Sequence, residues 1–363
     1  MTKQAVHQFL PTFEPGAIGS YAIAVRDALR AAGYESEIFA EFSKGGFEGR
    51  GKRHTEYGTT VVARPEDVLI YQMAIGSNVA DFVASLEQRL IVLHHNITPV
   101  EYYEPWDPGV TYGMAWGRDQ LRRLAPRATA GFAVSEYNRR ELEALHYRRT
   151  ATLPFLVDLD AFRHEVDEAA VARFAAERAG GGADWLFVGW IAPHKCQHDI
   201  VRAFAAYRAM YDPAARLHLV GRVGCEPYAD AVRELVVELG LADAVRLPGR
   251  VSDGELGACY MEADVLVSMS EHEGVGIPLL EAMHHRLPIV AHAAAAVPET
   301  VGDAGILLPR KRPATVAAAV HRIIEDGPLR RALVARGARR VQQYSPARTV
   351  PALLGAVAAV VAG

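Results

Sequence analysis

The stretch from residue 263 to residue 283 constrains the fold of this chain more than any other part of the sequence. It opens with ADVLVSM, a mostly apolar run that is typical of a buried strand in a parallel sheet. A loop with Gly274 and Gly276 follows, and Pro278 then opens an amphipathic helix, because proline is favoured in the first turn of a helix. The sequence therefore predicts a strand, loop and helix of the kind that builds α/β folds.

The loop and the first turn of this helix have the chemistry of an anion site. Backbone N–H groups and the helix dipole attract a negative group such as a diphosphate. Glu273 lies in the loop and Glu281 about one turn into the helix, so the two carboxylates reach points on the order of 10 Å apart. That span suits a nucleotide sugar, with one carboxylate at the ribose and the other at the sugar. The alternative is an ordinary loop and a surface helix with two solvated glutamates.

The whole segment SEHEGVGIPLLEAM, residues 270–283, resembles the donor-site motif of the retaining glycosyltransferases of family 4, also called glycosyl transferases group 1. These enzymes have the GT-B fold. The resemblance implies that Glu273 contacts the transferred sugar and that Glu281 holds the ribose. It also implies that the donor is bound by the residues between them, Gly274, Val275, Gly276 and Ile277.

A second part of the resemblance surrounds Lys195. The family pattern is Gly-Arg, a loop and a lysine, and the two cations neutralise the diphosphate as it leaves. The segment GWIAPHK has Lys195 in place but Trp190 where the arginine is expected. Arg222, at the end of the next predicted strand, is the candidate for the second cation. The alternative is that Lys195 works alone with the helix dipole.

Three more regions join the predicted site through the resemblance. The loop PTFEPGAIGS would approach the donor's phosphates and sugar through Gly16 and Gly19, whereas the alternative is a tight turn. His95, which follows the predicted strand 90–94, would lie near the donor sugar and the acceptor, or else anchor its loop. Arg250 and Val251, after a Pro-Gly turn, would lie beside the nucleobase, or else only form a turn. Aromatic side chains after His95 would line the acceptor side or pack the loop: Tyr102, Tyr103 and Trp106.

The length of the chain, 363 residues, exceeds the usual size of one hydrophobic core. Strands and helices alternate along it. These two features predict an α/β protein with parallel sheets and two domains. The family resemblance implies that these are the two Rossmann-like domains of the GT-B fold, which face each other across a cleft. Residues 1–155 would form the acceptor-side domain and residues 156–345 the donor domain, while residues 346–363 would form a helix that crosses back to the first domain.

The composition of the chain indicates which kinds of partner the protein can bind and in which cell compartment it acts. The formal charge of −4 shows no basic excess of the kind that nucleic-acid binding needs. The spacing of the cysteines Cys196, Cys225 and Cys259 is typical neither of disulfide pairs nor of a metal site. The first residues do not form a signal peptide, and no apolar run approaches the length of a membrane span. We therefore expect a cytoplasmic protein. Residues 116–127 predict a basic amphipathic helix, which indicates either peripheral contact with the inner membrane face or a solvated face.

Two arrangements of possible metal ligands are set aside. Asp158 and Asp160 form a D-x-D pair, but it falls in the predicted linker between domains. His194 and His198 have a zinc-like spacing without a third ligand or a general base. The sequence therefore predicts no metal and no cofactor.

The resemblance implies a retaining, metal-independent hexosyltransferase active in polysaccharide biosynthesis. It would use a UDP-, GDP- or other nucleoside-diphosphate sugar, and the acceptor would be a hydroxyl of a glycan, a lipid-linked saccharide or a small molecule. The catalytic residues would be Lys195, Glu273 and His95. Two alternatives remain open at this point: a nucleotide-sugar epimerase of the same fold, and a subunit that binds the donor without catalysis.

Overall fold

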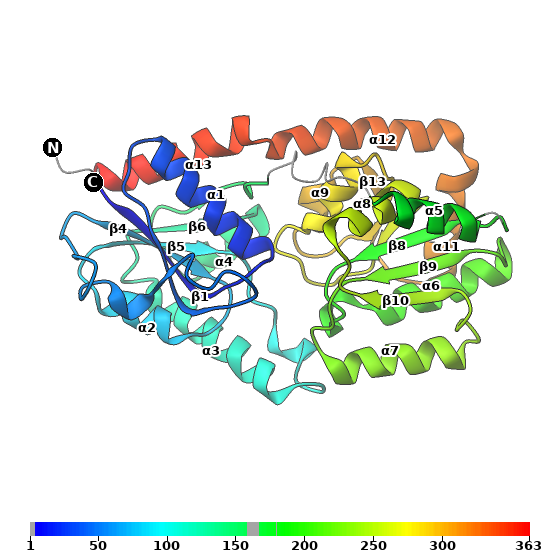
Figure 1. Ribbon diagram of the computed structural model, residues 1–363, viewed down its shortest axis with the longest axis horizontal. Coiled ribbons are helices and arrows are strands. Elements are labelled where there is room, and N and C mark those ends of the chain that lie inside the picture. The colour runs from blue at the N-terminus through cyan, green and yellow to red at the C-terminus, as the bar shows by residue number, and fades with distance from the viewer. Residues whose placement is uncertain (1–3, 158–166, 179) are drawn as a thin grey trace. The chain divides into compact units, whose positions relative to one another are not determined.

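The computed structural model describes residues 4–157, 167–178 and 180–363 (Figure 1). The chain divides into two compact units. The first comprises Met1–Glu104, Pro108–Val157 and Tyr344–Gly363, and the second comprises Pro105–Asp107 and Asp158–Gln343.

The first unit is built on a seven-stranded parallel sheet of order β3-β2-β1-β4-β5-β6-β7. Its strands are β1 (Val6–Phe13), β2 (Ile38–Ser43), β3 (Lys52–Arg53), β4 (Val68–Met73), β5 (Arg89–His94), β6 (Ala130–Ala133) and β7 (Ala151–Thr152). Its α-helices are α1 (Ala17–Ala31), α2 (Asn78–Ser85), α3 (Pro108–Leu124), α4 (Glu136–Ala144) and α13 (Pro346–Val361). The central strands β1 and β4 are almost wholly buried, as expected for strands covered on both faces.

The second unit is built on a six-stranded parallel sheet of order β10-β9-β8-β11-β12-β13. Its strands are β8 (Asp184–Val188), β9 (Arg216–Val220), β10 (Val245–Gly249), β11 (Val265–Ser268), β12 (Ile289–His292) and β13 (Gly305–Leu308). Its α-helices are α5 (Glu168–Arg178), α6 (Gln197–Met210), α7 (Glu226–Glu238), α8 (Asp253–Glu262), α9 (Ile277–His284), α10 (Val297–Val301), α11 (Pro313–Glu325) and α12 (Gly327–Val341). Helix α6 packs against α7 and α11, whereas α5 packs against α8, so two groups of helices cover the sheet (Figure 1). The predicted α/β class with parallel sheets is confirmed.

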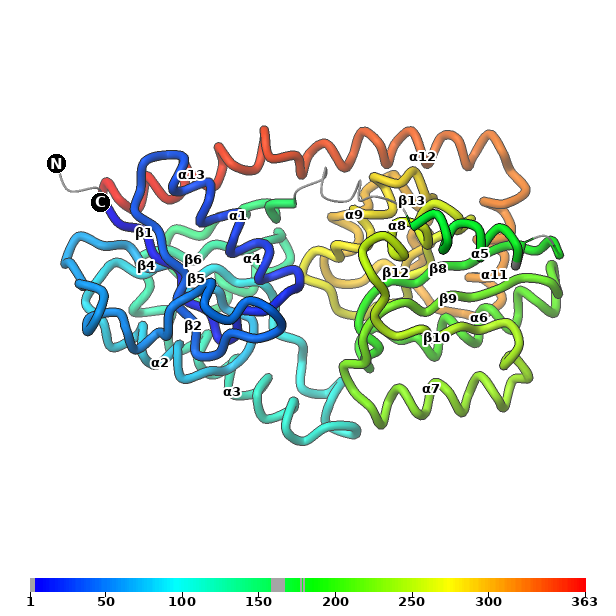
Figure 2. The backbone as a smooth tube through the Cα atoms, in the orientation of Figure 1, coloured from blue at the N-terminus to red at the C-terminus, as the bar shows by residue number. Residues whose placement is uncertain are grey.

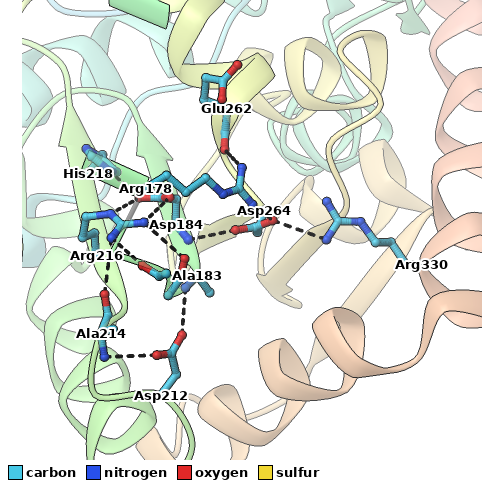
Figure 3. Close-up of polar contacts among 12 residues, drawn as sticks. Arg178, Ala183, Asp184, Asp212, Ala214, Arg216, His218, Glu262, Asp264 and Arg330 are labelled. Carbon is cyan, nitrogen blue, oxygen red and sulfur yellow. Dashed lines mark hydrogen bonds and ion pairs between the residues drawn. The ribbon is translucent and has the colours of Figure 1, made fainter. Parts of the chain in front are cut away.

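A network of ion pairs holds the amino ends of three strands in the second unit (Figure 3). The Asp184 carboxylate, at the start of β8, accepts bonds of 2.8 Å from Arg216 and 3.0 Å from His218 on β9. Asp264, just before β11, accepts a 2.7 Å bond from Arg178 and a 3.0 Å bond from the backbone N–H of Asp184. The charges that tie these strands together therefore lie at the ends where the strands begin.

The last two helices, α12 and α13, test the expectation that no apolar run is long enough to span a membrane. By length and composition alone, the helical stretch Gly327–Val361 could cross a membrane, so on that measure the expectation is wrong. Within this stretch, α13 packs on α1 (Figure 2). It buries Leu353, Val357 and Val360, a stripe at helical spacing that is typical of a helix on a protein surface.

Candidate functional site

The order of strands in the second unit defines where a ligand can bind. From β8 the chain moves outward to β9 and β10, and it then returns to place β11 on the other side of β8. The loops after β8 and β11 therefore leave the sheet side by side and continue in opposite directions. Open α/β sheets bind their ligands at such a switch point, at the carboxyl ends of the strands.

These two loops bring the predicted residues Lys195 and Glu273 together. Lys195 lies on a 3₁₀ turn, η4 (Pro193–Lys195), after β8, and Glu273 lies after β11. The Lys195 Nζ atom lies 2.7 Å from Glu273 Oε1, and both side chains are mostly buried. The backbone N–H of Glu271 donates a 2.9 Å bond to the carbonyl of His194, which fixes one loop against the other. The switch point therefore holds a cation and a carboxylate in direct contact.

The loop after β11 turns sharply into α9. Gly276 has φ 82°, and a Cβ there would lie 2.8 Å from Leu279 Cδ1, so only glycine fits this turn without displacement. The Thr300 hydroxyl donates a 2.6 Å bond to the carbonyl of Val275 and holds the loop from α10. The residue at the N-cap position of α9 is Gly276, which has no side chain that could cap the helix. The helix therefore presents backbone N–H groups rather than a capping side chain beside the Lys195 and Glu273 pair.

Glu281, on α9, is held by a residue that the sequence analysis missed. The Tyr260 hydroxyl, on α8, donates a 2.5 Å bond to Glu281 Oε2, and the Tyr260 ring stacks on His285 at 5.1 Å between centroids. Burial raises the pKa of Glu281 to about 7, while the bond from Tyr260 acts in the opposite direction. Tyr260 and Glu281 are on different helices, so no sequence spacing connects them.

The Arg222 guanidinium stacks on the face of the Trp190 ring. The Arg222 guanidinium carbon lies 3.9 Å from the centroid of the Trp190 ring, which is 47% exposed. The backbone supports this stack, because the N–H of Ile191 donates a 3.0 Å bond to the carbonyl of Arg222. The indole that stands in the arginine's place therefore positions an arginine from the neighbouring strand end.

Arg250 and Val251 lie elsewhere in the second unit, on the loop between β10 and α8, two strands from β8. Arg250 is exposed. Val251 lines a surface pocket together with Pro248 and Phe174. The surroundings of Arg250 and Val251 do not test contact with a nucleobase, so that role stays a prediction.

The remaining predicted residues lie in the first unit. Gly16 and Gly19 follow β1, which is next to β4 at the switch point of that sheet. A Cβ on Gly19 would lie 2.0 Å from the carbonyl oxygen of Glu14, which explains this glycine by packing. His95 directly follows β5 and is 7% exposed. Burial and the neighbouring His94 lower the pKa of His95 to about 3, so its ring is neutral at physiological pH.

The three aromatic residues after His95 differ in their surroundings. Tyr103 is buried, and Trp106 packs edge-on against Tyr228 at 5.3 Å between centroids. Packing accounts for both of these side chains. Tyr102 is only partly buried.

Among the described residues, side chains of the types that bind metals meet in one place, and this place is not the pair His194 and His198. Ligand atoms of Cys196, His198 and Asp199 lie within 4.8 Å of one another. The Lys311 ammonium lies 2.7 Å from Asp199 Oδ2 and 2.5 Å from Glu271 Oε1, so a metal ion would have to displace or repel it. Burial raises the pKa of the Cys196 thiol to about 11, which disfavours the thiolate that binds metals. These residues fit a metal poorly. Asp158 and Asp160 lie outside the described residues.

Known structures share this architecture over nearly the whole chain. The sucrose-phosphate synthase of Thermosynechococcus elongatus matches with a TM-score of 0.76 and 18% identity, covering 99% of this chain and 100% of that one. HepE of Anabaena, solved with UDP and glucose, matches with a TM-score of 0.74 and 18% identity, covering 98% and 100%. The protein therefore has the GT-B fold that the sequence predicted.

The sequence comparisons give the family. Residues 170–340 match the family described as glycosyl transferases group 1. A D-inositol 3-phosphate glycosyltransferase of Kineococcus radiotolerans is 32% identical in an alignment of 263 residues that covers 67% of this chain and 59% of that protein. A GDP-mannose-dependent alpha-(1-6)-phosphatidylinositol monomannoside mannosyltransferase of Mycobacterium tuberculosis is 32% identical over 222 residues, 58% of this chain and 56% of that protein. The chain thus spans less than two thirds of the length of these relatives. Residues 170–340 thus match glycosyl transferases group 1, and the predicted resemblance to this family is confirmed.

Proposed function

We propose that this protein is a retaining glycosyltransferase that moves a hexosyl unit from a nucleoside-diphosphate sugar to an acceptor hydroxyl. The observation that carries the proposal is the contact between Lys195 and Glu273 at the switch point, beside the uncapped start of α9. A cation, a helix dipole and backbone N–H groups together stabilise a diphosphate leaving group. Relatives with GDP-mannose-dependent activity, and a structural neighbour solved with UDP and glucose, support this donor class.

The proposed reaction needs charge stabilisation more than a strong base. The bond between the anomeric carbon and the diphosphate oxygen breaks, and a bond from that carbon to the acceptor oxygen forms on the same face. The acceptor's proton passes to the departing phosphate oxygen. In the chain, Lys195 would stabilise the leaving diphosphate, Glu273 would bind the transferred sugar and Glu281 would hold the ribose. His95, which is neutral, would contact the sugar rather than the phosphates.

The donor loop around Gly276 and the βα turn at Arg250 and Val251 would complete the donor site of the second unit. Gly16 and Gly19 stay predicted contacts to the donor. The acceptor class remains a glycan, a lipid-linked saccharide or a small molecule. The protein would act in the cytoplasm. On α3, Asp119 pairs with both Arg122 and Arg123, which lowers the net charge of the basic face and favours a solvated surface over a membrane contact.

Incubation of the pure protein with UDP- and GDP-hexoses tests this function. Slow release of nucleoside diphosphate is the expected result, and a glycoside formed with a saccharide acceptor should keep the anomeric configuration of the donor. Conversion of the donor to its epimer would instead identify an isomerase. Binding without turnover of any donor, with and without saccharide acceptors, would identify a non-catalytic subunit.

The transfer should need no divalent metal, because the side chains around the Lys195 and Glu273 pair supply cationic groups and the Cys196 cluster fits a metal poorly. We expect turnover to stay within about twofold after treatment with a chelator, since charge neutralisation comes from protein groups. Nucleoside diphosphate release, measured with and without EDTA, checks this. Loss of activity that magnesium or manganese restores would contradict it.

Arg222 should act as the second cation on the diphosphate, with Trp190 as its support. We expect Arg222→Ala to lower turnover by about a hundredfold, comparable to the loss of one oxyanion donor. Trp190→Ala should lower it only severalfold, because a stacked arginine at an exposed site gains roughly 0.5–1 kcal/mol. Turnover of both variants is measured at saturating donor. A negligible effect of Arg222→Ala would show that Lys195 acts without this partner.

A further inference from the structure

Three buried polar side chains of the first unit form a continuous chain of hydrogen bonds that ends at His95. Gln8, on β1, donates through Nε2 to the carbonyl of Ala22 on α1, at 2.9 Å. Gln72, on β4, donates through Nε2 to Gln8 Oε1, at 2.7 Å. Gln72 Oε1 contacts His95 Nε2. Gln8 and Gln72 are completely buried, so no water competes for these bonds.

The backbone carbonyl at one end sets the direction of every bond in this chain. A carbonyl oxygen only accepts, so the amide nitrogen of Gln8 must face Ala22 and its oxygen must face Gln72. That oxygen also only accepts, so Gln72 must turn its nitrogen to Gln8 and its oxygen to His95. The Nε2 atom of His95 must then carry the proton, because its partner is an acceptor. Nδ1 of the neutral ring is therefore a lone-pair acceptor.

That acceptor is buried and, among the described residues, has no hydrogen-bond partner. Nearby, Tyr21 packs edge-on against the His95 ring at 5.1 Å between centroids, and its hydroxyl is likewise buried without a partner in the described part of the chain. A buried polar atom without a partner costs roughly 1–3 kcal/mol, so such atoms in a native protein call for an explanation. A bound ligand that donates a hydrogen bond to His95 Nδ1 would explain why this atom has no partner within the described residues.

We propose that Gln72, anchored by Gln8, fixes His95 in the tautomer that carries its proton on Nε2, so that Nδ1 accepts a hydrogen bond from a hydroxyl of the bound sugar. The sugar as ligand rests on the proposed function. Gln72 and Gln8 are positioning residues, since they act only through His95. A fixed acceptor selects a hydroxyl at this point and rejects a carbonyl or carboxylate oxygen, which has no proton to donate. His95 then neither transfers protons nor binds phosphate as a cation.

The tautomer is measured on the free protein by long-range ¹H–¹⁵N NMR spectra of the histidine rings. The chain has 14 histidines, so the His95 signals are identified as those that disappear in His95→Gln. We expect one neutral ring with the proton on Nε2, unchanged between pH 5 and pH 8. A ring with its proton on Nδ1, or one that titrates in this range, would overturn the proposal. No donor is needed, so this result does not depend on the proposed function.

A pair of variants tests what the tautomer does. Gln72→Met removes the acceptor that holds Nε2–H, and Gln120→Met serves as the matched control, because Gln120 is also buried in the first unit and bonds to Ser77 and Asp81 instead. We expect Gln72→Met to give mixed tautomers and turnover lowered roughly tenfold, with unchanged affinity for nucleoside diphosphate. Gln120→Met should leave the His95 spectrum and turnover unchanged.

Equal losses of turnover in the two variants would reduce the role of Gln72 to general stability and overturn the proposal. So would full turnover in Gln72→Met with mixed tautomers. If the wild-type protein turns over no donor, the proposed function fails, and the spectra alone still decide the tautomer.

Discussion

Lys195→Ala is expected to lower turnover at least about a hundredfold, because one lost donor to a developing anion typically costs about 2.7–4 kcal/mol of transition-state stabilisation. The structure adds a second reason. Lys195 contacts Glu273 at 2.7 Å, so its removal leaves the carboxylate without this cation where the diphosphate is proposed to bind. The variant should therefore also bind nucleoside diphosphate more weakly. Turnover is measured as release of nucleoside diphosphate, and affinity by calorimetry.

The double variant Lys195→Ala/Glu273→Gln separates these two effects. Removing the carboxylate charge should restore much of the nucleotide affinity without restoring turnover, since the missing cation acts on the leaving group. Lys311→Met is a useful control for charge alone, because Lys311 pairs with Asp199 and Glu271 rather than Glu273. Near-normal turnover in Lys195→Ala would mean that the donor site is assigned wrongly and would favour a non-catalytic role.

Glu281→Ala is expected to weaken the binding of nucleoside diphosphate by roughly 1.5–3 kcal/mol for each charged hydrogen bond to the ribose that is lost. Calorimetry with UDP and GDP measures this effect. Glu281→Gln keeps the size of the side chain and loses only the charge, so it should fall between the wild type and the alanine variant. Unchanged affinity in Glu281→Ala would exclude contact with the ribose.

The raised pKa of Glu281, about 7, gives this binding a pH dependence of known sign. Ribose hydroxyls donate to the ionised carboxylate, so binding favours the deprotonated form and releases a proton. Affinity should therefore rise roughly tenfold between pH 6 and pH 8, as the ionised fraction increases through the pKa. The diphosphate also titrates near pH 6, and Glu281→Gln isolates that contribution because it has no carboxyl to ionise. A wild type with the same pH profile as Glu281→Gln would contradict the assignment.

The same pKa has the opposite effect on folding. A carboxyl group whose pKa is higher in the folded state than in the unfolded chain stabilises the folded state. This contribution to the free energy of unfolding is fully present at pH values below the pKa of the group in the unfolded chain. Its contribution is lost as the pH rises through about 7. Glu281 thus favours folding at low pH and ligand binding at high pH.

Local patterns in the sequence were sufficient to predict the strand, loop and helix that carry the candidate site. The apolar run before Met269 became β11, and the helix predicted to open at Pro278 begins at Ile277. Glycine and proline affect the backbone conformation of only a few neighbouring residues. Their effect can therefore be predicted without knowing the rest of the fold. The family motif added Lys195 and Glu273 as site residues.

What the sequence could not predict is which distant side chains contact one another. Lys195 and Glu273 are 78 positions apart, and their ion pair depends on the order of strands in the sheet. The same holds for Tyr260 with Glu281, and for Gln72 with His95. The sequence predicts Arg222 as the second cation because it follows the next strand after Trp190, but its stacking on the indole depends on how the two loops pair.

The ion-pair network around Asp184 and Asp264 (Figure 3) lies at the opposite ends of the strands from the loops after β8 and β11. Natural variation can therefore act on the two ends separately. If these loops bind the donor as proposed, substitutions in them would change the preferred donor while the polar anchors of the sheet remain in place. The unusual Trp190 is a change of this kind, located in a loop and far from those anchors along β8. For the same reason, exchanging these loops with those of relatives would show whether they set the donor specificity without disturbing the sheet.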